Sequence, residues 1–456
     1  MISESVLDKI RNISGEVHTD NSTCQTHGLD WTRFYKPNPS AVVFPRTTQE
    51  VGAIVKLANE YNFGLVPSGG RTGLSGGAVA INKELVVSFD KMNKILEFDA
   101  VDCSVRVEAG VVTRTLQEYA RNKGLYYPVD FASSGSSQLG GNIATNAGGI
   151  KVLRYGLTRD WISGLKVVTG RGDILELNHG LIKNATGYDL RHLYIGSEGT
   201  LGFVTEASVQ LTTDPGSLSV VLLAVPKMTD VVAVLRAFRE QTSLTAFEFF
   251  SDVALQYVIE HMDLSVPFSK RSDYYVLVEC IEDDDAITNV FMDCTDSGWV
   301  VDGIVSQSGQ QNKDFWRYRE NISEAITPFT PYKNDISVRV SKVPEFLAAI
   351  QDKVMSQYPD FEIVWFGHIG DGNLHLNILK PISWDLDRFK QRCEKVSESI
   401  LGVVSSFRGS ISAEHGVGLL KRDQLRYTRS EIEIATMQAL KKVFDPNDVM
   451  NPGKLL

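Results

Sequence analysis

Short apolar runs dominate the first half of the chain, and their alternation with polar positions predicts β-strands. FGLVP, ELVVSFD, SVRVEAG, LKVVTG and EASVQLTT are all rich in apolar or β-branched residues. Between these runs, residues 49–61 and 113–123 place apolar side chains at the three- and four-residue spacing of helices. Glycine and serine cluster between residues 67 and 202. We therefore expect strands and helices joined by several polar loops.

The pattern changes near the turn-forming sequence Asp214-Pro215-Gly216. Beyond it, the chain alternates strand-like and helix-like segments: LSVVLLAV, then MTDVVAVLRAFREQ, then YYVLVEC. Alternation of this kind predicts a separate α/β domain with its own sheet. Further on, residues 430–444 have the spacing of an amphipathic helix, which Asp445-Pro446 is expected to end.

Composition narrows the class of protein. The 456 residues include 43% hydrophobic and 22% charged positions, which is ordinary for a soluble globular protein of two or three domains. A net charge of −10 argues against nucleic acid as the main partner, and no apolar run approaches the ~20 residues that would cross a bilayer. The N-terminal residues lack the apolar core of a secretory signal, and the five scattered cysteines form no CxxC pair. We expect a cytoplasmic protein without disulfide bonds.

The glycine-rich stretch PSGGRTGLSGGAV at residues 67–79 follows a predicted strand, as a dinucleotide-binding loop would. Its spacing is not GxGxxG, however, and the next element is another strand rather than a helix. Successive glycines can instead let backbone N–H groups converge on an anion, with Arg71 and Thr72 as further donors. The alternative is an ordinary glycine-rich turn.

A second stretch favours a ligand. Residues 130–149, DFASSGSSQLGGNIATNAGG, offer many backbone and hydroxyl donors to a large polar molecule. A disordered linker is the alternative, but Leu139 and Ile143 argue for an ordered loop. A third stretch, residues 195–211, adds more small residues before a predicted strand.

Together, PSGGRTGLSGGAV, GGNIATNAGG followed by RYG, TGYDLRHLYIGSEGTLG and the terminal NPGK resemble motifs of the vanillyl-alcohol-oxidase type of flavoprotein. That family includes enzymes that oxidise D-lactate, glycolate and D-2-hydroxyglutarate. The resemblance implies an α+β fold: an FAD-binding domain of two subdomains (1–213), an α/β substrate or cap domain with an antiparallel sheet (214–410), and a C-terminal helical segment (411–456) that completes the active site and the flavin pocket.

The resemblance also implies FAD, with its pyrophosphate in the first loop and its adenine–ribitol side against the second. No histidine lies in or near the first loop, where some relatives attach FAD covalently, so we expect non-covalent FAD. The residues implied for FAD binding are Ser68, Gly69, Gly70, Arg71, Thr72, Gly73, Gly76, Gly77, Asp130, Gly135, Ser136, Gly141, Asn142, Thr145, Asn146, Gly149, Gly156, Glu198, Gly202, Val204 and Asn451.

Two histidines flank a strong turn signal in EIVWFGHIGDGNLHLNILK, residues 362–380. If Asp371-Gly372 forms a type I′ turn, His368 faces His375 across two strands. Facing residues have Cβ atoms roughly 4.5–5.5 Å apart, a spacing that suits two ligands of one metal. Alternation places Asn377 on the same face. The alternative is a pair of structural histidines on a hairpin.

The segment SAEHGVG, residues 412–418, supplies a carboxylate and another histidine. Neighbours on a regular strand point to opposite faces, so we expect Gly416 to permit a bend that turns both side chains inward. Imidazole and carboxylate ligands suit zinc, manganese or cobalt, and we favour Zn²⁺. GHxGDGNLHxN and SAEHGVG are similar to motifs of D-2-hydroxy-acid dehydrogenases. The resemblance implies His368, His375 and Glu414 as metal ligands, Asn377 as a substrate contact and His415 as the catalytic base.

Such a site has a coherent chemistry. A divalent cation on the C2 hydroxyl of the substrate lowers the pKa of that hydroxyl and fixes its orientation. A histidine accepts the hydroxyl proton near neutral pH, and the C2 hydrogen leaves as hydride to the flavin.

A hydroxy acid also needs cations for its carboxylate. In FWRYRENISEAITPFTPYKNDIS, the family pattern implies Arg319, Ser323 and Lys333 as substrate-binding residues. Arginine can bind a carboxylate through two hydrogen bonds, and lysine adds a second charge, although both are usually solvated surface residues. An R-E-x-I-[TS] motif followed by K-x-D resembles the hydroxyglutarate enzymes more than the lactate or glycolate branches. We therefore expect D-2-hydroxyglutarate as substrate, with D-malate as a possible second one.

Other hypotheses stay open at this stage. A D-lactate or glycolate dehydrogenase would bind a monocarboxylate and would not need Lys333. A catalytically silent flavoprotein subunit would lack part of the set His368, His375, Glu414 and His415, all of which are present. The family further implies an electron acceptor, either an electron-transfer flavoprotein or a quinone, and a homodimer.

Overall fold

A computed structural model describes residues 2–32 and 34–456 of the chain. The chain folds into two compact units, each with its own sheets and helices. The first unit contains the residues up to Gly149, Gly156–Asp214 and Glu414–Leu456, and the second contains Ile150–Tyr155 and Pro215–Ala413. The predicted α+β class is confirmed.

The first unit has two sheets. In the four-stranded sheet, of order β1-β2-β4-β3, strands β2, β4 and β3 run parallel. In the five-stranded sheet, of order β5-β6-β9-β7-β8, all neighbours are antiparallel. The five strands predicted here from alternation are confirmed as β3, β4, β6, β7 and β9. The bounds are β1 (Val17–His18), β2 (Ala41–Val43), β3 (Leu65–Ser68), β4 (Leu85–Ser88), β5 (Ile95–Asp99), β6 (Ser104–Glu108), β7 (Ile162–Thr169), β8 (Ile174–Leu177) and β9 (Gly202–Gln210).

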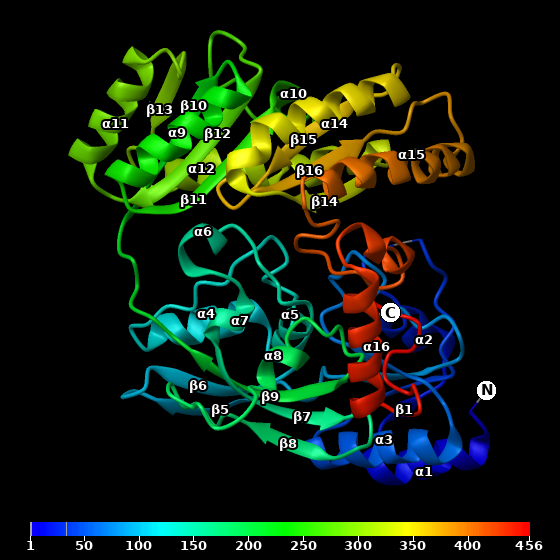
Figure 1. Ribbon diagram of the computed structural model, residues 1–456. Helices are drawn as coiled ribbons and strands as arrows, with labels where there is room; N and C mark the ends of the chain where they lie inside the picture. The colour runs from blue at the N-terminus through cyan, green and yellow to red at the C-terminus, as the bar shows by residue number, and fades with distance from the viewer. Residues whose placement is uncertain (1, 33) are drawn as a thin grey trace. The chain divides into compact units, whose positions relative to one another are not determined.

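The parallel strands are apolar because both faces of their sheet are buried. On one face, Val42, Val66 and Val86 belong to a small cluster, and the other face packs on the larger core beneath α3. The side chain of Thr47 caps α3 by accepting a hydrogen bond from the N–H of Glu50. Helices α1 and α3 lie side by side (Figure 1).

The helices of the first unit include the three predicted from periodicity: residues 49–61 fall in α3, 113–123 in α4 and 430–444 in α16. Helix α16 begins with a capping box between Ser430 and Glu433 and ends before Asp445. The bounds are α1 (Glu4–Ser14), α2 (Asn21–His27), α3 (Thr48–Tyr61), α4 (Thr113–Asn122), α5 (Leu139–Thr145), α7 (Thr158–Trp161), α8 (Arg191–Tyr194), η3 (Arg422–Tyr427) and α16 (Glu431–Phe444).

The second unit is built on one seven-stranded sheet of order β13-β10-β12-β11-β15-β16-β14. Every neighbouring pair is antiparallel, as predicted for this part of the chain. The bounds are β10 (Leu218–Val225), β11 (Leu244–Ser251), β12 (Tyr274–Ile281), β13 (Asp302–Val305), β14 (Tyr332–Ser337), β15 (Ile363–Gly367) and β16 (Asn373–Ile378).

Helices cover this sheet along its length. Figure 1 shows α9 and α11 near the β13 end and α14 and α15 near the β14 end, while α10, α12 and α13 contribute to one core with β10, β11 and β12. The bounds are α6 (Val152–Tyr155), α9 (Met228–Gln241), α10 (Asp252–His261), α11 (Asp284–Asp296), α12 (Gly309–Glu320), α13 (Ile322–Ala325), η1 (Thr327–Phe329), η2 (Val340–Lys342), α14 (Val343–Gln357) and α15 (Leu386–Ser406).

A six-residue segment, 150–155, belongs to the second unit although its flanking residues belong to the first. Both flanks, Gly149 and Gly156, have positive φ, at +126° and +73°. Within the segment, buried Lys151 forms an ion pair with Glu279 of β12, and the indole of Trp316 donates a hydrogen bond of 3.0 Å to the same carboxylate. The segment is therefore anchored in the interior of the second unit.

Among residues 2–32 and 34–456, none of the helices combines the length and the hydropathy that a membrane crossing requires.

Candidate active site

The first glycine-rich loop connects two parallel strands, β3 and β4, and contains no helix, as expected. No described residue accepts a hydrogen bond from the backbone N–H groups of residues 70–75. Arg71 has a φ of +60°, which is uncommon for a residue with a side chain. At Gly70, a Cβ would collide with the carbonyl oxygen of Ser136. Within the described residues, the N–H groups at 70–75 thus have no protein acceptor. The loop also packs closely against the second glycine-rich stretch.

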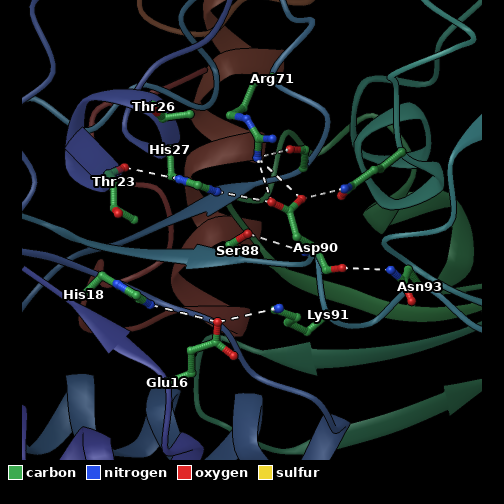
Figure 2. A network of polar contacts seen from close by, with 12 residues as sticks. Glu16, His18, Thr23, Thr26, His27, Arg71, Ser88, Asp90, Lys91 and Asn93 are labelled. Carbon is green, nitrogen blue, oxygen red and sulfur yellow. Dashed lines mark hydrogen bonds and ion pairs between the residues drawn. The ribbon is translucent and has the colours of Figure 1, made fainter.

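Asp90 lies two residues after the end of β4 and contacts both glycine-rich stretches (Figure 2). Its carboxylate lies 3.3 Å from Nη1 of Arg71 and accepts a hydrogen bond of 2.7 Å from Nε2 of Gln138. Nε2 of His27 lies 3.2 Å away. Burial by itself raises the pKa of Asp90, but the hydrogen bond from His27 and the charge of Arg71 outweigh it and lower the pKa to about 2. Asp90 is therefore an anion that orients Arg71.

The second stretch is not only a loop, because residues 139–145 form helix α5. Our expectation of an ordered loop was wrong in this respect. Two adjacent glycines, Gly140 and Gly141, lower the helix propensity, but Leu139 and Ile143, one turn apart, are fully buried. Tertiary packing outweighs propensity here. A Cβ at Gly141 would meet no atom within 4 Å, so this helix has an open side.

The C-terminal segment returns to the first loop. The carboxylate of Glu198 accepts hydrogen bonds of 2.8 and 2.7 Å from the N–H groups of Val417 and Gly418, and burial raises the pKa of Glu198. Nδ2 of Asn451 donates to the carbonyl oxygens of Gly77 and Glu198, at 2.8 and 2.7 Å. Two residues implied for FAD binding, Glu198 and Asn451, therefore join the loop to the end of the chain.

Three glycines implied for FAD binding have a structural explanation. A Cβ at Gly149 would collide with the carbonyl of Asp130, and one at Gly202 with the carbonyl of Val168. A Cβ at Gly156 would collide with the carboxylate of Asp160. Val204 is buried within β9. The role of these residues toward FAD stays a prediction.

The loops suit a large polar cofactor. In the described part of the chain, the buried Oγ of Ser68, Oε1 of Gln138 and Oδ1 of Asn451 have no hydrogen-bond partner. A buried polar atom without a partner is costly, so these positions favour a ligand with hydrogen-bonding groups of its own. Together with the free N–H groups of residues 70–75, they fit an FAD pyrophosphate.

In the second unit, the predicted register of the histidine hairpin is wrong. Strand β15 ends at Gly367 and β16 begins at Asn373, so five residues connect them rather than two. His375 pairs with Phe366, not with His368. The His368 carbonyl accepts hydrogen bonds from the N–H groups of Asp371 and Asn373, at 3.1 and 3.2 Å, which closes a longer turn. Burial of Ile369 and a hydrogen bond from the N–H of Gly370 to β11 hold that turn.

Despite the different register, the two histidines lie together. Their ring centroids are 5.4 Å apart, and both side chains are largely buried. Nδ1 of His368 lies 2.8 Å from Oε1 of Glu248, and Nδ1 of His375 lies 3.7 Å from Oδ1 of Asp335. In metal sites, a carboxylate beside Nδ1 typically orients the imidazole ring so that Nε2 faces the metal. The two rings therefore have the environment of metal ligands.

Glu414 directly follows the last residue of the second unit. The N–H of Ala413 donates to the carbonyl of Asp335, at 3.4 Å, and the chain bends at residues 413–415 before Gly416, whose φ is +76°. Each of His368, His375 and Glu414 offers one ligand atom, and these atoms lie within 4.8 Å of one another. Asp335, Glu414 and His415 form a second group of the same kind. The predicted bend at Gly416 is confirmed, and the implied ligand set fits a divalent cation.

Arg319 on α12 is a buried cation, with 6% of its surface exposed. Nη2 lies 2.8 Å from Oε2 of Glu248, but neither Nε nor Nη2 makes an aligned hydrogen bond to any described residue. Its guanidinium also lies 4.8 Å from the centre of the Phe366 ring. These two donors form the edge of the guanidinium that can bind a carboxylate through two parallel hydrogen bonds.

The other implied substrate residues lie on neighbouring elements of the same unit. Nζ of Lys333 donates a hydrogen bond of 2.8 Å to Oγ of Ser323. Lys333 is directly opposite Asn377 in the β14–β16 pairing. Nδ2 of Asn377 is bonded at 3.3 Å to the carbonyls of Val364 and His375. Ser323 and Lys333 are thus in direct contact, whereas Asn377 is buried and tied to its own strands.

Sequence reasoning missed three carboxylates. Glu248 lies on β11 between fully buried phenylalanines, Asp335 on β14 is 1% exposed, and Asp90 follows β4. The available signal was a charged residue inside an apolar run, as in AFEFF, because a carboxylate is rarely buried there without partners.

Two protein-family models match this chain. A model of the FAD-linked oxidase C-terminal domain matches residues 215–455, and a model of an FAD-binding domain matches residues 39–178. The chain is 55% identical to D-2-hydroxyglutarate dehydrogenase of Stutzerimonas stutzeri (strain A1501), over 100% of this chain and 99% of that protein. It is 34% identical to the mitochondrial D-2-hydroxyglutarate dehydrogenase of Bos taurus, over 100% and 84% of the two chains.

Solved structures agree on the fold. p-Cresol methylhydroxylase superposes with a TM-score of 0.77 at 14% identity, covering 100% of this chain and 97% of that one. Alkyldihydroxyacetonephosphate synthase gives 0.75 at 18% identity, with coverage of 99% and 86%. At such identities the similarity establishes the fold alone, and it confirms the predicted vanillyl-alcohol-oxidase type.

Proposed function

Because this chain belongs to the FAD-linked oxidase family and is an FAD-dependent oxidoreductase, we propose that it oxidises D-2-hydroxyglutarate to the 2-oxo acid. Its relatives named for this substrate match the chain over nearly its whole length. D-Malate, a shorter D-2-hydroxy dicarboxylate, is the second proposed substrate.

One observation carries the proposal. Arg319 is buried, yet its Nε and Nη2 atoms have no aligned hydrogen-bond partner among the described residues. An arginine in that state is costly unless a ligand completes its hydrogen bonds. The planar carboxylate of a hydroxy acid matches this edge of the guanidinium.

The second carboxylate of the substrate is assigned to Lys333 and Ser323. The Lys333 ammonium is exposed and already lies beside the Ser323 hydroxyl, so both can donate to one carboxylate. A monocarboxylate such as D-lactate or glycolate would leave this pair unused. The pair therefore favours a dicarboxylate.

We assign the reaction to residues as follows. His368, His375 and Glu414 would hold a divalent cation, proposed to be zinc, which lowers the pKa of the C2 hydroxyl when bound. FAD, held without a covalent bond, supplies the acceptor for the C2 hydride. His415 accepts the hydroxyl proton as the C2–O double bond forms. Asn377 orients the substrate beside the metal ligands.

We further propose an electron acceptor, a compartment and an oligomeric state for the enzyme. The reduced flavin is reoxidised by an electron-transfer flavoprotein or a quinone, the enzyme works in the cytoplasm, and it forms a homodimer. Net charge and scattered cysteines support the second of these.

The test is anaerobic bleaching of the flavin absorbance in the purified protein by D-2-hydroxyglutarate, D-malate, D-lactate or glycolate. L-2-Hydroxyglutarate serves as the stereochemical control, and a metal chelator is added in a parallel series. Rapid, chelator-sensitive bleaching by the two D-dicarboxylates supports the proposal. Bleaching chiefly by lactate or glycolate would replace the substrate, and bleaching unaffected by metal removal would reject the metal.

A further inference from the structure

Glu248 has an environment that the functional assignments above do not use. It lies on β11, is 1% exposed, and its neighbours Phe247 and Phe249 are buried. Burying a carboxylate among aromatic side chains is strongly unfavourable unless other groups compensate its charge and its hydrogen bonds. The partners of Glu248 therefore explain why the residue is there.

Those partners come from two different elements. Oε1 lies 2.8 Å from Nδ1 of His368, which follows β15, and Oε2 lies 2.8 Å from Nη2 of Arg319 on α12. Each carboxylate oxygen thus serves one partner. A single side chain connects a residue implied as a metal ligand with the arginine assigned to the substrate carboxylate.

Toward His368, the carboxylate has a defined effect. A carboxylate at Nδ1 accepts a hydrogen bond, so the proton of the neutral ring resides on Nδ1 and Nε2 keeps its lone pair. The same partner fixes the orientation of the ring. Both effects prepare Nε2 to bind a cation.

Toward Arg319, the carboxylate supplies charge without occupying the binding edge. Nη2 is 2.8 Å away, but its N–H is not aligned with the carboxylate oxygen, and Nε has no partner in the described part of the chain. Glu248 therefore offsets the cost of burying the guanidinium while two donors remain available to a ligand.

The other histidine provides an internal comparison. Asp335 lies 3.7 Å from Nδ1 of His375 and is held by Nδ2 of Asn373, at 2.9 Å. Both carboxylates can orient a histidine, but Glu248 has the additional contact with Arg319.

We propose that Glu248 is a positioning residue that couples the metal site to the substrate-binding arginine: its carboxylate orients His368 for the cation and places Arg319 for the substrate. The inference rests on the proposed function for the role of Arg319. The part that concerns His368 depends only on the metal site.

The test compares Glu248→Gln with Asp335→Asn, which removes the charge behind the other histidine. Each amide keeps the size of the side chain and an acceptor oxygen for the ring. Zinc affinity, measured by chelator competition without substrate, is expected to fall about 10–100-fold in Glu248→Gln, the usual effect of losing such a partner. KM for D-2-hydroxyglutarate, measured at saturating zinc, is expected to rise at least tenfold in Glu248→Gln and less than threefold in Asp335→Asn.

A double-mutant cycle with Arg319→Met identifies the coupling directly. If Glu248 acts on substrate through Arg319, the two changes together raise KM much less than the product of their separate effects. Independent effects, or a zinc affinity within twofold of the unmodified protein, would overturn the inference. Flavin absorbance and circular dichroism check folding, and Glu248→Asp, which keeps the charge at a shorter reach, replaces Glu248→Gln if the latter does not fold.

Failure of the proposed function would give a different result from failure of this inference. If the unmodified protein does not oxidise D-2-hydroxyglutarate, the substrate assignment falls. The zinc affinity of Glu248→Gln still decides whether this carboxylate supports the metal site.

Discussion

The two units prepare for their ligands by opposite means. In the first unit, the loop after β3 offers backbone N–H groups at residues 70–75. Glycines in this loop allow close contact with neighbouring backbone. In the second unit, buried charged side chains provide the interactions: Glu248, Asp335, Arg319 and two histidines. The first arrangement depends on backbone conformation, and the second depends on charge and protonation.

This difference determines which substitutions each unit tolerates. An added methyl group can abolish a site made of backbone donors, although no polar atom is lost. A site made of charged side chains tolerates changes of size better than the loss of one charge, because the partner then remains buried without compensation. Five substitutions test this contrast between the two units.

Replacing His375 with alanine should have the largest effect. The variant loses one of three implied metal ligands, and metal assistance worth several kcal/mol corresponds to about a 1000-fold fall in rate. Flavin bleaching rate and zinc content of the purified protein measure the outcome. His179→Ala, at an exposed position, is the control. Unchanged zinc content and rate in the His375 variant would remove this residue from the metal site.

Gly70→Ala tests the loop after β3, where backbone N–H groups are the proposed donors to FAD. Its new Cβ collides with the carbonyl of Ser136, and overpacking of this kind costs about 1–3 kcal/mol. FAD retention through gel filtration is expected to fall together with thermal stability. Gly402→Ala is the control, because its Cβ meets nothing within 4 Å and alanine favours helix α15. Equal FAD retention in the two variants would contradict the close approach at Gly70.

Arg319→Lys keeps a positive charge but loses the two-donor edge of the guanidinium. Hydrogen bonds to charged groups contribute about 1.5–3 kcal/mol, so KM should rise roughly 10–100-fold while FAD content stays constant. Arg236→Lys on the exposed surface of α9 is the control. Equal KM values for D-2-hydroxyglutarate in both variants would show that a point charge suffices at position 319.

Asp90→Asn should alter the pH dependence of stability. The pKa of Asp90 in the folded state, about 2, lies below the ordinary value of 3.8, so the ionised group stabilises the fold above about pH 4. This contribution, roughly 2 kcal/mol, is lost as the pH falls from 4 towards 2. Denaturant unfolding at pH 7 and pH 2.5 should show a smaller loss for the variant than for the unmodified protein. Parallel losses would contradict the lowered pKa.

Lys333→Met should have the smallest effect. An exposed charge contributes at most about 1 kcal/mol, so KM for D-2-hydroxyglutarate should rise about fivefold or less. The informative quantity is its ratio to KM for D-lactate, which has no second carboxylate. A ratio that does not change would remove Lys333 from substrate recognition.

Much of the fold was predictable because local patterns agreed with tertiary packing. Strands β3, β4, β6, β7 and β9 were visible as apolar or alternating runs, and α9 coincides with the segment predicted to be helical. Helix α5 was missed because Gly140 and Gly141 disfavour a helix locally, while the burial of Leu139 and Ile143 stabilises one. The predicted division at residues 213 and 410 stays a prediction.

The candidate site was predictable in its residue types and less so in its geometry. Spacing alone brought His368 and His375 together, but the register was off by two positions because the turn is longer than Asp371-Gly372 suggested. Glu248 and Asp335 were missed because they lie 120 and 40 residues from the histidines that they contact. A charged residue in an apolar run, as in AFEFF, indicates that a partner is needed, but local sequence does not identify which histidine it is.

The segment at residues 150–155 has a consequence for how this protein can be divided or recombined. Between Gly149 and Gly156, the chain of the first unit is interrupted by six residues of the second unit, and their lysine, Lys151, is buried against Glu279 of that same unit. A fragment ending at residue 214 would retain Lys151 and expose it, while the complementary fragment would keep Glu279 buried with no cation. Gene fusion or domain exchange at a single cut is therefore disfavoured.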